Sequence, residues 1–125
     1  MSKKKILVVD DEVGITRMLK RNLEATNQYE VRMENSSKAA VATAREFLPE
    51  LIIMDVMMPE MDGGEVAALL KDDKRLGQIP IVFLSAIVKK EETQAAGGNI
   101  GGQTFLAKPV KLDDLIACIE GYLGK

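Results

Sequence analysis

Residues 51–55 have the sequence LIIMD, a run of four apolar residues with an aspartate directly after it. Residues 6–10 (ILVVD) have the same form, and in residues 81–85 (IVFLS) a serine follows the four apolar residues. Continuous apolar runs are typical of strands that are buried on both faces, whereas half-exposed strands alternate apolar with polar residues. The three runs therefore predict central strands of a sheet that is covered by helices on both faces.

Two further segments are predicted to be strands at the edges of this sheet. Residues 29–34 alternate apolar with charged residues, and residues 103–107 are short and mixed. Apolar residues at helical spacing predict helices around residues 15–23, 39–47, 64–72 and 112–123. Ser36 and Ser37 are expected to cap the second of these helices. Residues 89–102 are expected to form a short helix followed by a loop, because this segment ends in a glycine run.

The predicted order is strand then helix, repeated five times without an internal sequence repeat. This order calls for a parallel sheet with right-handed crossovers and helices on both faces. With residues 29–34 and 103–107 at the edges, the pattern fits a flavodoxin-like, doubly wound α/β fold with strand order 2-1-3-4-5, although burial alone does not order the three inner strands. The length of 125 residues fits a single domain, residues 1–125.

Composition excludes several classes of function. Lys and Arg total 17 against 19 Asp and Glu, so the net charge of −2 does not indicate a nucleic-acid or membrane surface. The first apolar run is too short for a signal peptide, and a cytoplasmic protein is expected. The sequence has no histidine, which excludes Ser-His and Cys-His nucleophile pairs and zinc sites with histidine ligands.

Reactive side chains follow four of the five predicted strands, at the sheet edge where such folds place their functional crevice. They are Asp10, Asp11 and Glu12, then Asp55, Ser85 and Lys108. Each close pair of carboxylates repels by roughly 1 kcal/mol in water and about 4 kcal/mol at an intermediate dielectric. The cluster therefore requires a cation. Oxygen ligands favour a hard ion, Mg²⁺ best, with Mn²⁺ as a substitute, and Lys108 supplies a second positive charge.

Four motifs resemble the receiver domain of two-component response regulators, in the same order and over essentially the whole chain. They are Asp10-Asp11, residues 55–63 (DVMMPEMDG), Ser85-Ala86 and residues 105–109 (FLAKP). The resemblance implies a phosphoprotein that carries an aspartyl phosphate in a two-component system or phosphorelay. It catalyses only its own phosphorylation and dephosphorylation, and is otherwise not an enzyme.

By this resemblance, Asp55 is the phosphoacceptor. It takes the phosphoryl group from a phosphohistidine on a histidine kinase or a histidine phosphotransfer protein. The side chains of Asp11 and Asp55 and the backbone carbonyl of Met57 bind Mg²⁺, while Asp10 acts through water. Glu12 is expected to support the metal site without being a direct ligand.

The resemblance also implies a switch. Lys108 and Ser85 bind phosphoryl oxygens, and Phe105 follows Ser85 as the rotating aromatic residue. A phosphoryl group adds negative charge and acceptor oxygens, which attract the Ser85 hydroxyl and the Lys108 ammonium. The surface of the fourth helix, fifth strand and fifth helix is then biased toward its active form and controls a downstream protein or output domain.

Three residues are expected to be structural near the site. Pro59 and Gly63 shape the loop after Asp55, with a fixed and a permissive backbone dihedral respectively. By resemblance, the Lys108–Pro109 peptide bond is cis. The glycine run at residues 97–102 departs from the Gly-Ala turn that receivers usually have before the fifth strand.

Two other functions remain open from the residues. A phosphohydrolase that forms an aspartyl phosphate would usually have a nucleophilic aspartate after the first strand and a second aspartate two residues later. Here the residue two positions after Asp10 is Glu12, and no cap domain fits. A pseudo-receiver would bind a partner without phosphorylation. The sequence also leaves open the kinase, the downstream target, the oligomeric state, and whether the chain is a stand-alone regulator or a piece of a larger protein.

Overall fold

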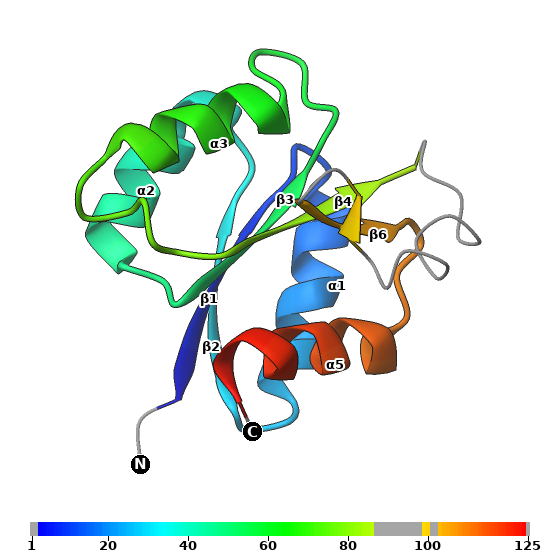
Figure 1. The fold of residues 1–125 in the computed structure, drawn as a ribbon. Helices are drawn as coiled ribbons and strands as arrows, with labels where there is room; N and C mark the ends of the chain where they lie inside the picture. The colour runs from blue at the N-terminus through cyan, green and yellow to red at the C-terminus, as the bar shows by residue number, and fades with distance from the viewer. Residues whose placement is uncertain (1–2, 87–98, 101–102, 125) are drawn as a thin grey trace.

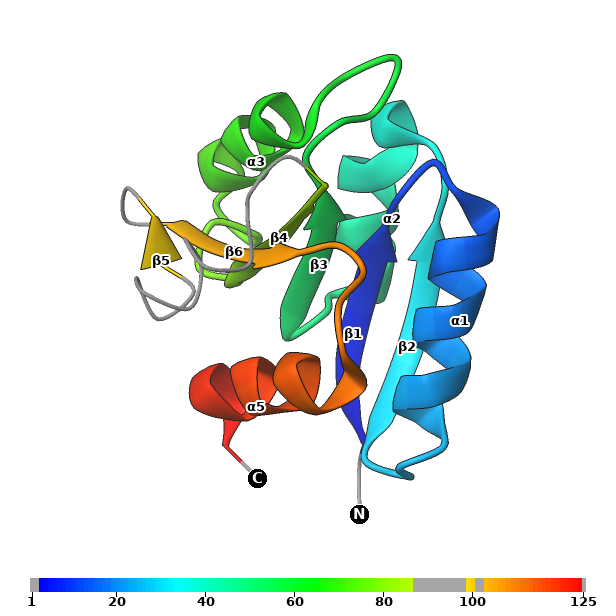
Figure 2. The same cartoon turned by 90° about the vertical axis from the view of Figure 1, so that its right-hand side faces the viewer.

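The computed structural model describes residues 3–86, 99–100 and 103–124. The elements are β1 (Lys4–Val9), α1 (Val13–Glu24), β2 (Tyr29–Glu34), the 3-10 helix η1 (Ser37–Ala39), α2 (Ala40–Phe47), β3 (Leu51–Asp55), α3 (Gly63–Asp72), β4 (Ile81–Ser85), β5 (Asn99–Ile100), β6 (Gln103–Ala107) and α5 (Leu112–Leu123). Figure 1 and Figure 2 show three layers, with α2 and α3 on one face of the sheet and α1 and α5 on the other. None of the described helices is both long and apolar enough to cross a membrane.

The sheet order is β2-β1-β3-β4-β6-β5. β2, β1, β3, β4 and β6 are parallel. With β6 counted as the fifth strand, they have the predicted order 2-1-3-4-5. β5 is an addition that was not predicted, and it pairs antiparallel with β6 at the edge where β6 itself was expected. A strand of two residues within a glycine-rich sequence has no periodicity that could reveal it. The short helix expected at the start of residues 89–102 lies outside the described residues.

The apolar runs of the central strands supply two cores, one on each face. Alternate residues point to opposite sides of a strand, so each run contributes to both cores. Toward α2 and α3 the strands present Leu7, Val9, Ile52, Met54 and Phe83. Toward α1 and α5 they present Ile6, Val8, Leu51, Ile53, Val82 and Leu84. All of these side chains are buried, which confirms that the three runs are central strands.

The expected cap at Ser36 and Ser37 is wrong in its chemistry. Ser36 takes the N-cap position of η1, but its side chain makes no capping hydrogen bond. The Ser37 hydroxyl instead accepts a hydrogen bond from the Met61 backbone N–H, in the loop between β3 and α3. A complete capping box forms at α3, where the Asp62 side chain accepts from the Glu65 N–H and Glu65 accepts from the Asp62 N–H.

Gly63 is required for space rather than for an unusual dihedral. Its φ is not in the left-handed region, where Gly124 is the only glycine among the described residues. A Cβ on Gly63 would lie 2.5 Å from the Asp55 carbonyl oxygen and 3.2 Å from the Val56 Cα, both backbone atoms. The Gly63 N–H also donates to the Val56 carbonyl at 2.8 Å. The start of α3 is thus packed directly against the end of β3.

Two side chains of α1 bind the backbone N–H and carbonyl of Val31 in the edge strand β2. The Val31 N–H donates to Glu24 Oε2 at 3.0 Å, and Lys20 Nζ donates to the Val31 carbonyl at 2.7 Å. Lys20 and Glu24 are also an ion pair at 3.0 Å. Unpaired edge groups are a template for pairing with another chain, so this contact both stabilises the strand and shields it.

We expect Gly63→Ala to lower the free energy of unfolding by about 1–3 kcal/mol, because the added methyl group meets backbone atoms that cannot move away cheaply. Gly121→Ala is the control. Gly121 lies within α5 with nothing within 4 Å of an added Cβ, so alanine there should stabilise by roughly 0.5–1 kcal/mol. Urea denaturation measures both. Equal effects of the two substitutions would contradict the close packing of Gly63.

We expect Glu24→Gln to lower stability at neutral pH by less than about 1 kcal/mol, since water screens this partly exposed pair. Burial alone would raise the pKa of Glu24, but the Val31 hydrogen bond and Lys20 outweigh it, so the pKa lies below its ordinary value of 4.5. The stabilisation is therefore complete above pH 4.5 and is lost as the pH falls through the lowered pKa.

The measurement is the difference in unfolding free energy between wild type and Glu24→Gln, from pH 7 down to pH 3. Glu46→Gln is the control, because the Glu46 side chain is paired with Arg32 but 76% exposed. A Glu24→Gln difference that does not change with pH would contradict the assignment.

Candidate functional site

Three aspartates meet at the carboxyl ends of the central strands. Asp10 follows β1, Asp11 is the next residue, and Asp55 is the last residue of β3. One carboxylate oxygen from each lies within 4.8 Å of the others. Asp10 and Asp55 are 1% and 4% exposed, whereas Asp11 is exposed, so the cluster opens to solvent on the Asp11 side.

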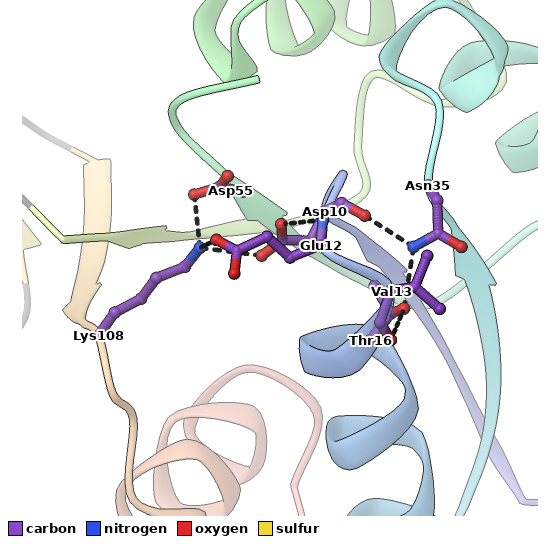
Figure 3. Close-up of polar contacts among 7 residues, drawn as sticks. All are labelled: Asp10, Glu12, Val13, Thr16, Asn35, Asp55 and Lys108. Carbon is purple, nitrogen blue, oxygen red and sulfur yellow. Dashed lines mark hydrogen bonds and ion pairs between the residues drawn. The ribbon is translucent and has the colours of Figure 1, made fainter. Parts of the chain in front are cut away.

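Lys108 reaches this cluster from the residue after β6 (Figure 3). Its Nζ lies 3.0 Å from Asp10 Oδ2 and 3.0 Å from Asp55 Oδ1. Burial alone lowers the pKa of Lys108, but its hydrogen bonds to the two carboxylates outweigh this effect and leave the pKa raised. Lys108 is thus held as a cation between two buried anions.

The Asp55 carboxyl group has a raised pKa. Burial is the largest cause, and the negative charges of Asp10 and Asp11 add to it, while the hydrogen bond from Lys108 acts in the opposite direction. Lys108 therefore compensates the Asp55 charge only in part. An additional cation at the cluster would favour the ionised form of Asp55, which is the nucleophilic form.

Ser85 and Phe105 lie on the two strands beyond β3. Ser85 is buried at the end of β4, one residue beyond the position that pairs with Asp55. Its backbone carbonyl accepts from the Lys108 N–H at 3.0 Å, which ties Lys108 to the end of β4. Phe105 on β6 is partly buried and stacks on Phe83, with ring centroids 5.2 Å apart.

The remaining predicted residues surround the cluster. The Glu12 N–H donates to Asp10 Oδ1 at 2.9 Å, and Glu12 Oε1 lies 3.8 Å from Lys108 Nζ. Met57 has a largely exposed side chain, and Pro59 is exposed on the same loop. The Lys108–Pro109 peptide bond is cis, which confirms the prediction.

Sequence reasoning missed two residues that hold the turn carrying Asp10 and Asp11. Asn35 Nδ2 donates to the Asp10 carbonyl at 2.8 Å and to the hydroxyl of the fully buried Thr16 at 2.9 Å. Asn35 directly follows β2, so the rule that led to the other strand ends would also have found it. Thr16 is one polar residue on an otherwise apolar helix face, which is a weaker signal.

The cluster fits a hard divalent ion. Asp10, Asp11 and Asp55 carry three negative charges against one positive charge on Lys108, which leaves a formal charge of −2. A divalent cation would neutralise it. All the side-chain donors are carboxylate oxygens, which Mg²⁺ and Mn²⁺ prefer, and the exposed Asp11 leaves a path from solvent.

Known proteins resemble this chain over almost its full length. The family model of the response regulator receiver domain matches residues 6–120. The polar-differentiation response regulator DivK of Brucella ovis is 36% identical over 126 residues, which cover 99% of this chain and 98% of that protein. DivK of Brucella anthropi is 33% identical over 123 residues, 97% of each chain.

Solved structures agree with the family. The chemotaxis protein CheY4 of Vibrio cholerae has a TM-score of 0.82 at 27% identity, over 97% of this chain and 99% of that one. A response regulator from Desulfuromonas acetoxidans has a TM-score of 0.78 at 28% identity, over 96% of each chain. The chain therefore belongs to the response regulator receiver domain family, the phosphoacceptor signalling domains of two-component systems.

Proposed function

We propose that Asp55 is the phosphoacceptor of this receiver domain, in a reaction that depends on Mg²⁺. The observation that carries the proposal is a buried carboxylate at the end of β3, 3.0 Å from the Lys108 ammonium and clustered with Asp10 and Asp11. The family implies a histidine kinase as phosphodonor, or a histidine phosphotransfer protein in a phosphorelay. The donor histidine must belong to that partner, because this chain has none.

In the proposed site, Asp11, Asp55 and the Met57 carbonyl bind the metal, and Asp10 acts through water. Both Asp10 oxygens already accept hydrogen bonds, Oδ1 from the Glu12 N–H and Oδ2 from Lys108 Nζ. This arrangement supports an indirect role for Asp10 in metal binding. Glu12 supports the site without being a direct ligand. When bound, Mg²⁺ supplies positive charge that offsets the carboxylates and the incoming phosphoryl oxygens.

The reaction requires the ionised Asp55 carboxylate to attack phosphorus while the P–N bond to the donor histidine breaks and its electron pair stays on the imidazole. Lys108 balances the Asp55 charge, and its Nζ is already in hydrogen-bond reach. After transfer, Lys108 and the Ser85 hydroxyl bind phosphoryl oxygens. Hydrolysis of the acyl phosphate, catalysed by the same site, resets the domain.

Phe105 follows Ser85 in the proposed switch. Its stacking on Phe83 supports this role, because Phe83 lies two residues before Ser85 on β4, and both side chains therefore point to the same face of that strand. Movement of Ser85 toward the phosphoryl group would open space beside this ring pair. The surface of β6, α5 and the segment before β5 would then recognise a downstream protein or output domain.

We also propose that residues 1–125 form one receiver domain, which the family match over residues 6–120 supports. It places the protein in the cytoplasm, where its kinase partners act. The domain modifies only itself and turns over no separate substrate.

We expect Asp55→Asn to raise stability at pH 7 in buffer that contains EDTA. A folded-state pKa above the unfolded value of 3.8 means that the ionised carboxylate costs stability, fully so above the folded pKa. The amide removes this cost, and its advantage should shrink as the pH falls toward and below 3.8. Thermal unfolding of both proteins across this range is the measurement.

The control for this effect is Asp73→Asn, which should have the opposite sign. The hydrogen bond from Arg45, at 2.8 Å, lowers the pKa of Asp73, so its ionised form stabilises the fold and the amide loses that contribution. If Asp55→Asn also destabilises at pH 7, the raised pKa of Asp55 is wrong.

We expect one phosphoryl group to be added when the protein is incubated with Mg²⁺ and a small acyl phosphate. Intact-mass spectrometry measures the product. Asp55→Asn and removal of Mg²⁺ by EDTA should each abolish it, whereas Asp73→Asn, with the same change of charge far from the site, should be modified like the wild type. Steady phosphate release from many esters would instead indicate a phosphohydrolase, and no modification at all would indicate a pseudo-receiver.

A further inference from the structure

We propose that Asn35 and Ser37 are positioning residues that hold the two loops of the acidic site from one short segment, residues 35–37. This inference rests on the proposed function, since it assigns a role toward the same metal and phosphoryl site. Neither side chain makes a described contact with a carboxylate of the cluster. Asn35 contacts the backbone carbonyl of Asp10, and Ser37 contacts the backbone N–H of Met61 in the loop that follows Asp55.

Asn35 holds the first loop, between β1 and α1. Its Nδ2 donates one hydrogen to the Asp10 carbonyl and the other to the Thr16 hydroxyl, so both amide hydrogens are used. Thr16 can accept because its own hydroxyl hydrogen is directed to the Val13 carbonyl at 3.0 Å. Figure 3 shows Asn35 pointing from the end of β2 into this turn. The peptide that links Asp10 to Asp11 is thereby fixed to β2 and to the first turn of α1.

Ser37 holds the second loop, between β3 and α3. Ser37 is 4% exposed, and its hydroxyl accepts a hydrogen bond from the Met61 N–H at 3.1 Å. The same end of the loop is also held by the Gly63 N–H on the Val56 carbonyl and by the Asp62 capping box, and Glu60 forms an ion pair with Lys38 at 3.2 Å. Ser37 therefore adds a buried side-chain contact at Met61, one residue before the Asp62 cap, in the loop that begins after Asp55.

The segment that carries Asn35 and Ser37 is itself held by hydrogen bonds of the preceding residue, Glu34. Glu34 accepts hydrogen bonds from the Ser36 N–H and from the Thr43 hydroxyl on α2. The Glu34 carbonyl also accepts from the Asp10 N–H at 3.1 Å, as the last ladder bond between β2 and β1. A support of this kind keeps the two loops in register before any ligand binds. The cost of ordering them on binding is then already met in folding.

The consequence is specific to ligand binding. Hydrogen-bonded partners behind metal ligands orient those ligands, and their loss typically weakens metal affinity by 10–100-fold. Asn35 supports the backbone between Asp10 and Asp11 rather than a ligand atom, so we expect the low end of this range. Ser37 acts on the loop that contains Met57, so its loss should affect the rate of phosphoryl transfer as well.

The main test is Asn35→Leu, which keeps the approximate volume of the side chain and removes both donors. We expect the Mg²⁺ dissociation constant, measured by calorimetric titration, to rise roughly tenfold. We also expect the Glu12 amide to exchange faster with solvent, because its partner Asp10 Oδ1 is less well placed. Ser37→Ala should slow phosphorylation of Asp55 by several-fold at a saturating Mg²⁺ concentration.

Thr26→Val is the matched control. The Thr26 hydroxyl also braces a loop, donating to the Leu23 carbonyl at 2.7 Å and accepting from the Gln28 N–H, but it lies between α1 and the start of β2, away from the site. It should lower stability without changing Mg²⁺ affinity. If Asn35→Leu does not fold, Asn35→Ser removes the long amide donor with less disturbance, and the same titration applies.

The outcomes separate the two proposals. If Asn35→Leu and Ser37→Ala lose stability as Thr26→Val does but bind Mg²⁺ and accept phosphate like the wild type, residues 35–37 are structural and the inference is overturned. If the wild type itself neither binds Mg²⁺ nor is phosphorylated on Asp55, the proposed function is what fails. Weaker Mg²⁺ binding by Asn35→Leu with normal binding by Thr26→Val supports the positioning role.

Discussion

The rest of the site depends on one interaction, the paired contact of the Lys108 ammonium with the carboxylates of Asp10 and Asp55. Two buried carboxylates and a third at the rim repel one another, and at an intermediate dielectric each close pair costs about 4 kcal/mol. Lys108 offsets part of this repulsion from 3.0 Å on each side. The remaining excess of negative charge favours the binding of a divalent cation, and in the proposed function that cation would also offset the charge of the phosphoryl group.

The parallel sheet explains how such a cluster can exist. Asp10 follows β1 and Asp55 ends β3, two strands with apolar interiors, and Lys108 follows the mixed strand β6, so the three side chains meet at the carboxyl edge of the sheet. The close approach of Gly63 to the Asp55 carbonyl and the contacts of Asn35 and Ser37 then fix the loops. A stable scaffold therefore carries a locally unfavourable charge arrangement, as is common at functional sites.

Much of this arrangement was predictable because it depends on short-range patterns. The apolar runs gave the central strands, and the rule that parallel strands end at one edge brought Asp10, Asp55 and Lys108 together. The predicted cap by Ser36 and Ser37 failed, because Ser37 is a good N-cap residue locally but finds a partner, Met61, that is 24 residues away. Asn35 was missed although it also follows a strand, since an amide does not suggest catalysis in the way that an acid does.

The sequence by itself determined the order of elements, the burial of the central strands, the acids and the lysine at the strand ends, and the absence of any histidine in the chain. These follow from residue type and periodicity, which local chemistry controls. Only the tertiary structure decided that Lys108 bridges Asp10 and Asp55, and that residue 63 has no room for a Cβ beside the Asp55 carbonyl. It also decided that Asn35 and Ser37 contact the two loops of the site. Those contacts join residues that lie far apart along the chain or depend on how neighbouring segments pack, and no periodic pattern encodes such distances.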